Sequence, residues 1–178
     1  TRATPAIHGD VAVTESLAKY YERHRGIGPE EAMADAQTLT GMFNRAGIAT
    51  RVVADVRPVM WAKLFINVGI NAITALTGIT NGQLLDLEQT RRLARDAVQE
   101  AMAVAVSQGI AIDGDPVETV LRVAAATAAN RSSMGQDVDN RRLTEIAAIN
   151  GFIVRTARQA GLPVPINRTL TTLVETLQ

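Results

Sequence analysis

Four polar side chains stand at helical spacing within one apolar stretch of the sequence. Lys63, Asn67, Asn71 and Thr74 lie at about 0°, 40°, 80° and 20° around the axis of a helix that turns by about 100° per residue. Most positions around them are apolar or small, namely Trp61, Leu64, Phe65, Ile66, Val68, Gly69, Ile70, Ile73 and Leu76. An ammonium group and two carboxamides on one side of a helix could bind a small anionic compound and donate a proton to it.

These four residues, which we call the polar stripe, need polar surroundings if the helix is buried. A helix that is apolar around its circumference except for one narrow strip is typically buried, with the strip facing something polar. A buried amide without a partner costs about 1–3 kcal/mol, and an unpaired buried ammonium costs more. The stripe therefore faces a wet cleft, another polar chain or a ligand. The alternative is that its side chains hydrogen-bond to nearby backbone and only fix a helix crossing.

A second polar group follows later, around residues 130–134 and 144–146. Glu145 comes three and four residues after Arg142 and Arg141, which is the spacing of an exposed ion pair on a helix. Ser132 and Ser133 could be turn residues ahead of a helix cap at Asp137. Spacing alone favours these structural interpretations over a functional one.

Composition excludes several classes of function. Hydrophobic residues make up 47% of the 178 residues and aromatic residues only 3%, which is typical of a compact soluble protein with an aliphatic core. Lys+Arg and Asp+Glu are both 18, and this balance argues against a nucleic-acid or anionic-membrane surface. The absence of cysteine excludes disulfides, thiolate metal sites and cysteine nucleophiles, and it is compatible with the cytoplasm. His8 and His24 do not stand with carboxylates as in a metal site.

Two further features have simple interpretations. The cluster of Arg91, Arg92 and Arg95 is the solvated face of an amphipathic helix. The most apolar stretch, residues 64–76, contains two asparagines and is too short to span a membrane. The chain opens at Thr1 without a signal peptide, in what looks like the middle of a domain, so we expect a fragment.

The pattern of elements changes near Asp55. Before it, a strand-like run (Gly9–Thr14), a helix over about 29–46 and a β-branched run (Ile48–Val53) give the strand–helix–strand order of an α/β sheet. Two strands are too few for a stable sheet, so this part belongs to something larger. After Asp55 the pattern predicts helices over about 56–77, 83–108, 116–130 and 138–160, and a last one capped by Asn167.

Several separated motifs occur in order between residues 55 and 178. They are Trp61–Leu64 with Asn71–Leu76, Asn81–Leu84, Asn130–Asp137, Thr144–Ile146 with Ile149–Gly151, and Gly161–Thr169. Together they resemble the C-terminal domain of the ketopantoate reductases (2-dehydropantoate 2-reductases). Agreement at several spaced motifs is more specific than any one of them.

The resemblance implies a mainly α fold. Residues 58–178 would form a helical C-terminal domain of the 6-phosphogluconate-dehydrogenase-like type, and residues 1–57 a short α/β remnant of a Rossmann domain. The implied activity is NADPH-dependent reduction of 2-dehydropantoate to pantoate, on the route to pantothenate and coenzyme A. No Gly-x-Gly-x-x-Gly sequence occurs, so the chain lacks its own dinucleotide-phosphate loop, and we expect it to be inactive alone.

Matching the family residue by residue implies a role for each polar position. Lys63 would be the general acid that protonates the alkoxide left by hydride transfer. Glu145 would act beside it and close to the nicotinamide portion of NADPH. The implied substrate-binding residues are Asn67, Asn71, Asn130 and Ser133. No metal is expected.

The resemblance also implies a binding partner, and two alternative functions remain open. The expected partner is a small 2-keto acid, with a possible homodimer and with no nucleic acid or membrane. One alternative is a reductase of another small 2-keto acid. The other is a non-catalytic helical module for dimerisation or binding, although such a module has no reason to keep a lysine in the polar stripe.

Overall fold

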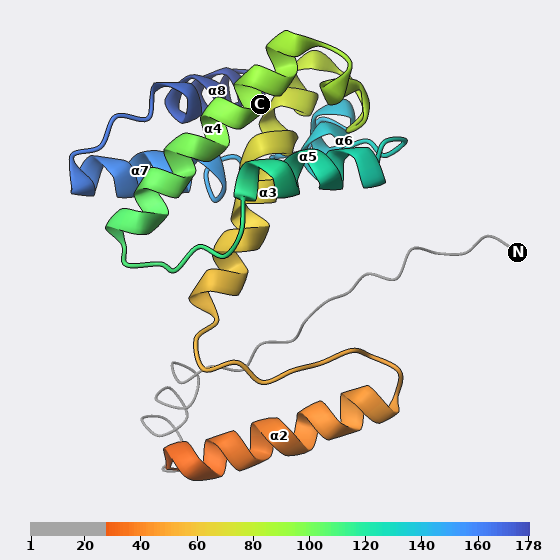
Figure 1. Ribbon diagram of the computed structural model, residues 1–178. Helices are drawn as coiled ribbons and strands as arrows, with labels where there is room; N and C mark the ends of the chain where they lie inside the picture. Colours follow the sequence, from red (N-terminus) through yellow and green to blue (C-terminus); the bar gives the residue numbers. More distant parts are fainter. Residues whose placement is uncertain (1–27) are drawn as a thin grey trace, which may run out of the picture. The chain divides into compact units, whose positions relative to one another are not determined.

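The computed structural model describes residues 28–178, and this part of the chain is helical (Figure 1). Seven α-helices and one 3₁₀ turn account for all regular structure among the described residues, which confirms the mainly α fold. The chain divides into two compact units between Val59 and Met60. The predicted strand Gly9–Thr14 and both histidines lie outside the described residues.

In the first unit, helix α2 runs over Pro29–Arg45, close to the predicted span. Its first turn contains a proline followed by Glu30 and Glu31, which suit the free N–H groups and the positive end of the helix dipole. After the helix, Gly47 adopts a φ of 81°, a left-handed conformation that favours glycine and ends the helix.

The predicted strand Ile48–Val53 is wrong, because the structure has no strand at these residues. The Asn44 side chain instead bonds to the backbone of this segment. Its Nδ2 donates to the Thr50 carbonyl oxygen and its Oδ1 accepts the Thr50 N–H, both at 2.9 Å. These are the groups that a strand would use for pairing. β-Branched residues favour a strand only where a neighbouring strand exists to pair with them.

The second unit is a bundle around one long helix. Its central helix, α3 (Arg57–Thr77), begins before the unit boundary, where the Asp55 side chain accepts the N–H of Arg57 at 2.9 Å. The later elements are η1 (Gln83–Leu85), α4 (Glu88–Ser107), α5 (Pro116–Ala126), α6 (Ser133–Asp139), α7 (Asn150–Ala160) and α8 (Pro165–Thr176). Helix α4 packs against α5, α7 and α8, and α7 lies beside α8 (Figure 1).

Helix α3 packs closely against α4 and α5 at Gly69. A Cβ atom at Gly69 would lie 2.7 Å from the Val120 side chain of α5 and 2.9 Å from the Val98 side chain of α4, closer than real Cβ contacts. Glycine therefore lets α3 approach both neighbours at this point. The core around it is aliphatic, and Val68, Val98 and Ile153 are fully buried.

Two predicted helices are shorter than the sequence suggested. The predicted span 83–108 is divided into the turn η1 and helix α4, and Thr90 at the start of α4 bonds through Oγ1 to the Leu84 carbonyl oxygen at 2.6 Å. Helix α5 starts as predicted, with Asp115 accepting the Val117 N–H at 2.8 Å, but it ends at Ala126 rather than near residue 130.

The predicted helix over 138–160 is wrong in its first half, whereas its second half forms α7 and ends at Ala160 as predicted. Helix α6 ends at Asp139, α7 begins at Asn150, and the segment between them is irregular. Arg141 has a φ of 53°, a left-handed conformation that interrupts a helix. The segment is held instead by Ile146 and Ile149, which are 1% and 5% exposed. Glu145 therefore does not lie on a helix with the two preceding arginines.

Two predicted caps have different roles. Ser132 rather than Asp137 caps α6, because Ser132 Oγ accepts the Gly135 N–H at 3.1 Å. Asn167 is not a cap but a fully buried residue inside α8. The Glu100 carboxylate from α4 takes the capping role by accepting the N–H groups of Ile166 and Asn167, both at 2.9 Å.

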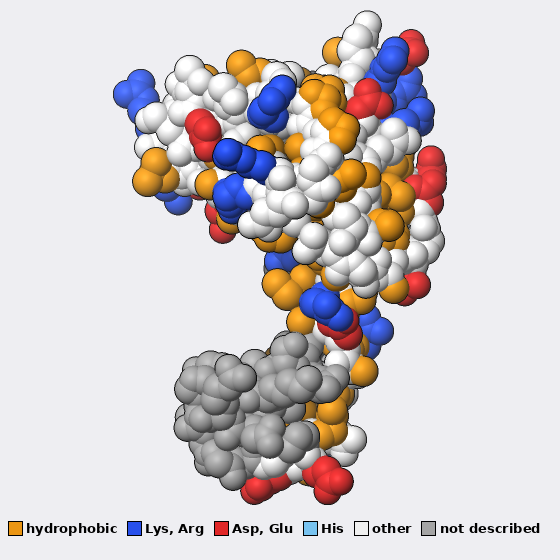
Figure 2. All heavy atoms as spheres, turned by 90° about the vertical axis from the view of Figure 1, so that its left-hand side faces the viewer, with side chains coloured by type: hydrophobic (Ala, Val, Ile, Leu, Met, Phe, Trp, Pro, Cys, Tyr) orange, Lys and Arg blue, Asp and Glu red, His pale blue; other side chains and the backbone are white. Residues whose placement is uncertain are grey.

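Helix α3 is long and apolar enough to cross a membrane by length and composition alone, contrary to the expectation from the sequence. Of its most apolar window, 56% is buried inside the protein. This burial accounts for the composition, because a central helix of a bundle is apolar on most of its faces. On the face drawn in Figure 2, charged side chains of both signs are interspersed with hydrophobic and uncharged ones.

Candidate functional site

The polar stripe on α3 passes from solvent into the core. Lys63 is exposed, Asn67 is half-buried, Asn71 is 7% exposed and Thr74 is fully buried. The gradient follows the position of the helix, because the C-terminal half of α3 lies among the other helices (Figure 1). The ammonium group is therefore free to meet a solute while the amides lie progressively deeper.

The members of the stripe differ in their partners. Thr74 Oγ1 lies 2.7 Å from Ser132 Oγ and 2.9 Å from the Ile70 carbonyl oxygen, so its hydroxyl is satisfied internally. Within residues 28–178, the side chains of Lys63, Asn67 and Asn71 make no hydrogen bond or ion pair. The interpretation of the stripe as a polar helix crossing therefore describes Thr74 but not the other three. An open pocket beside them stays a prediction.

Arg131 joins the end of α3 to the loop that precedes α6. Its Nη1 donates to the carbonyl oxygens of Thr74 and Ile79, the latter at 3.0 Å. Its Nε and Nη2 bind the Asp139 carboxylate at 2.9 and 3.0 Å. The guanidinium thus adds a second donor to the Thr74 carbonyl oxygen, which also accepts the Gly78 N–H at 3.1 Å, and binds the Ile79 carbonyl oxygen just after α3.

The Arg131 hydrogen bond lowers the pKa of the Asp139 carboxyl below its ordinary value of 3.8. A depressed carboxyl pKa means that the contact stabilises the fold at neutral pH. That contribution is lost only as the pH falls through the lowered pKa. The Asp139 carboxyl of this joint is therefore ionised at neutral pH.

This joint places the predicted substrate residues of the second group near the end of α3. The Asn130 carbonyl oxygen accepts the Asn81 N–H at 2.9 Å, and the next two residues, Arg131 and Ser132, bond to the carbonyl oxygen and the hydroxyl of Thr74. The side chains of Asn130 and Ser133 are exposed. Lys63 lies eleven residues before Thr74, about 16 Å along the helix axis.

Glu145 lies in the irregular segment between α6 and α7, and its side chain is exposed. Its backbone carbonyl accepts N–H groups from Ala148 and Ile149, at 2.9 and 3.1 Å, so the turn around it is ordered. No hydrogen bond or ion pair joins its side chain to Lys63, Asn130 or Ser133 in the described part of the chain. A common site for these residues stays a prediction.

A buried polar cluster that the sequence did not reveal supports the middle of α3. Asn150 Nδ2 donates to Asn167 Oδ1 at 3.0 Å and lies 3.5 Å from the Val68 carbonyl oxygen. Asn167 Nδ2 donates to the Ala97 carbonyl oxygen at 2.9 Å and to Glu100 Oε2 at 2.8 Å. The cluster thus links α4, α7 and α8 to α3 between the two predicted substrate amides. No local spacing signals contacts between residues this far apart in the sequence.

Solved structures define the class to which this fold belongs. The chain superimposes on a PanE/ApbA family ketopantoate reductase from Ralstonia eutropha with a TM-score of 0.76 and 34% identity, covering 79% of this chain and 47% of that one. A dimeric ketopantoate reductase from Staphylococcus aureus gives a TM-score of 0.70 and 26% identity, covering 80% of this chain and 50% of that one. A complex of D-mandelate dehydrogenase with NADH gives a TM-score of 0.72 and 25% identity, with the same coverage of 80% and 50% of the two chains. The described fold is therefore that of the helical part of these oxidoreductases.

Sequence comparison then gives the family. The family described as "Ketopantoate reductase PanE/ApbA C terminal" matches residues 55–178. A 2-dehydropantoate 2-reductase of Pyrobaculum aerophilum is 39% identical over 151 residues, 85% of this chain and 54% of that protein. One from Halobacterium salinarum is 37% identical over 163 residues, which are 88% of this chain and 54% of that protein. The chain belongs to the ketopantoate reductase family, as its motifs predicted, and it spans about half the length of the curated relatives it matches.

Proposed function

We propose that a protein containing this chain reduces a small 2-keto acid with NADPH, and that 2-dehydropantoate is the substrate. The chain would supply the substrate-binding and proton-donor side. The observation that carries this proposal is the set of three polar side chains, Lys63, Asn67 and Asn71, that project without internal partners from an otherwise apolar helix. Relatives that are named 2-dehydropantoate 2-reductase support the choice of substrate.

The residues of the stripe offer the chemistry that ketone reduction needs. When bound, NADPH supplies the hydride. The ketone oxygen then becomes an alkoxide, which the Lys63 ammonium group can stabilise and protonate. Asn67 stands one turn and Asn71 two turns further along α3, so that their amides can hold the hydroxyl and carboxylate of the substrate in a fixed orientation.

The second group of residues would complete the site. The Ser133 hydroxyl would bind the carboxylate end of the keto acid, with Asn130 next to it, and the Arg131 joint would fix both relative to α3. Glu145 would lie near the nicotinamide portion of the cofactor. Residues 28–178 contain no glycine-rich strand–turn–helix, so the phosphates of NADPH would be held elsewhere in the protein.

The wider organisation follows from the same proposal. Residues 1–57 would complete a Rossmann-type nucleotide-binding domain, and residues 58–178 would form the helical domain that covers the substrate. The protein would act in the cytoplasm. A homodimer is supported by the dimeric ketopantoate reductase among the similar structures.

A second candidate function is reduction of a different 2-keto acid. It is favoured by the similarity to D-mandelate dehydrogenase at 25% identity. A steady-state assay separates the two candidates. With this chain joined to a nucleotide-binding half, NADPH oxidation would be measured with 2-dehydropantoate, pyruvate and phenylglyoxylate. We expect kcat/KM for 2-dehydropantoate to exceed the others by at least about tenfold, a difference of about 1.4 kcal/mol in transition-state binding. Preference for another acid would select the second candidate, and no reduction of any would contradict both.

Replacing Asn71 by alanine tests the substrate contact. The KM for the keto acid should rise by about tenfold or more, because one hydrogen bond to a charged group contributes about 1.5–3 kcal/mol. The KM for NADPH should stay within about twofold. Since the Asn71 side chain has no partner within residues 28–178, stability should change little. A larger rise in the KM for NADPH than for the keto acid would show that Asn71 is misassigned.

A further inference from the structure

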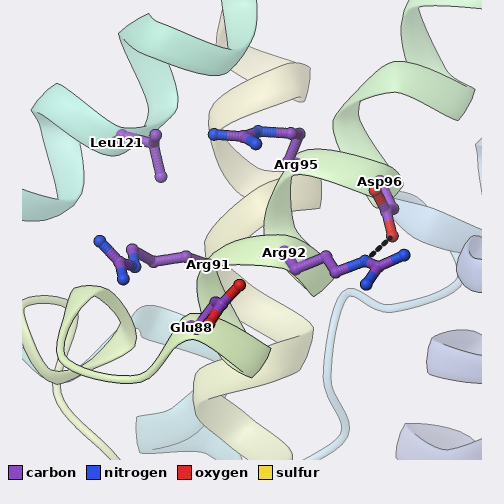
Figure 3. A pocket seen from close by; sticks show the side chains of 6 residues that line it. All are labelled: Glu88, Arg91, Arg92, Arg95, Asp96 and Leu121. Carbon is purple, nitrogen blue, oxygen red and sulfur yellow. Dashed lines mark ion pairs between the residues drawn. The ribbon is translucent and has the colours of Figure 1, made fainter.

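A hollow between α4 and α5 is lined by three arginines. Glu88, Arg91, Arg92, Arg95, Asp96 and Leu121 surround a space of about 520 Å³, a size in the range of small-molecule sites (Figure 3). The sequence predicted these arginines to be the solvated face of a helix, and all three are exposed. The structure adds that this face is concave and that α5 forms its other wall.

The three arginines are not equally neutralised. Arg92 pairs with Asp96 at 3.9 Å, and Figure 3 shows its side chain directed towards that carboxylate. Arg91 and Arg95 have no ion pair within residues 28–178, and in Figure 3 both extend on the opposite side of α4, where Leu121 lies. Glu88 is the other carboxylate at the rim, so the hollow keeps a net positive charge.

The positions of Arg91 and Arg95 are unfavourable for the isolated helix. They are four residues apart, and a like-charge pair at this spacing destabilises a helix by about 0.2–0.5 kcal/mol. Arg91 also lies in the first turn of α4, where the helix dipole favours negative charge. A bound anion between the two guanidinium groups would relieve both costs. Paired arginines suit phosphate in particular, because each guanidinium offers two parallel N–H donors.

A second hollow of about 560 Å³ continues along α4 and shares Arg95 with the first. Its lining also includes the uncharged side chains of Gln99 and Met102 from α4 and the carboxylates of Asp115 and Glu118. These carboxylates would repel a second anionic group. The two hollows therefore favour a ligand with negative charge at one end and an uncharged body.

We propose that α4 and α5 form a binding groove for an organic phosphate, with the phosphate between Arg91 and Arg95 and an uncharged body along Gln99 and Met102. None of these residues belongs to the proposed reductase site on α3, around residues 130–133 or at Glu145. The groove is therefore a second site, and its occupation does not depend on keto-acid reduction.

Titration of the full chain with n-hexyl phosphate tests this proposal, with inorganic phosphate as a probe for the head group alone. Nitrogen-15 NMR of the arginine Nε–H groups at constant ionic strength would report binding at each guanidinium. We expect saturable shifts at Arg91 and Arg95. The double variant Arg91→Ala/Arg95→Ala should weaken hexyl phosphate binding by at least about tenfold. Inorganic phosphate should bind more weakly than hexyl phosphate.

The matched control is Arg155→Ala/Arg158→Ala, which removes two exposed arginines from α7 and leaves the groove intact. This variant should bind hexyl phosphate as the unaltered chain does. Because all four arginines are exposed, circular dichroism should show that both variants remain folded. Shifts that rise without saturation, or equal weakening in both double variants, would overturn the phosphate site. Equal affinity for inorganic and hexyl phosphate would overturn the assignment of the uncharged body.

Discussion

Replacement of Lys63 by alanine should lower kcat for keto-acid reduction by about a hundredfold to ten-thousandfold, the usual contribution of a positioned general acid. The melting temperature should stay close to that of the unaltered protein. Lys63 is exposed and its side chain has no hydrogen bond or ion pair within residues 28–178, so little folding energy depends on it. Steady-state kinetics with the chain joined to a nucleotide-binding half, together with thermal unfolding, would measure both effects.

Replacement of Lys63 by arginine is the control that separates charge from proton donation. Arginine keeps the positive charge but does not release its proton near neutral pH. We expect Lys63→Arg to keep a KM for the keto acid near that of the unaltered enzyme while kcat falls almost as far as in the alanine variant. Normal turnover combined with a large fall in melting temperature for Lys63→Ala would instead make the lysine structural.

Replacement of Asn167 by alanine should have the largest effect on stability, a loss of about 2–4 kcal/mol in the free energy of unfolding. The side chain is fully buried and bonds to Ala97, Glu100 and Asn150. Its removal leaves a cavity and takes away the nearer of two acceptors of the Asn150 amide, the other being the Val68 carbonyl oxygen. Chemical denaturation of the full chain, followed by circular dichroism, would measure the change.

The matched control for this prediction is Asn140→Ala. Asn140 is exposed and directly follows α6, and its side-chain amide makes one hydrogen bond to the Gln136 carbonyl oxygen of that helix, at 2.6 Å. Its loss should change the free energy of unfolding by less than about 1 kcal/mol. If Asn167→Ala were no more destabilising than Asn140→Ala, the buried cluster would not support the packing of α3, α4, α7 and α8.

The helices that the sequence predicted well are those with local signals at both ends. Helix α2 has a proline at its start and Gly47 after its end, whereas α5 has a clear signal only at Asp115 and the following proline, and only its start was predicted well. The errors occurred where apolar periodicity continued through a break. The prediction of one continuous helix over 138–160 was wrong because Arg141 adopts a left-handed conformation, which an arginine in the sequence does not indicate. The predicted strand Ile48–Val53 failed because strand formation depends on a partner elsewhere.

The sequence alone determined that α3 is apolar with one polar stripe, because the direction of each side chain around a helix is a local property. Its motifs also determined the family. Only the tertiary structure decided that Thr74 is satisfied internally, that Arg131 joins the loop to α3, and that Asn167 supports the core instead of capping a helix. These outcomes depend on pairs such as Thr74–Arg131 and Glu100–Asn167, which are 57 and 67 residues apart. Contacts over such separations arise from packing, which a local pattern does not encode.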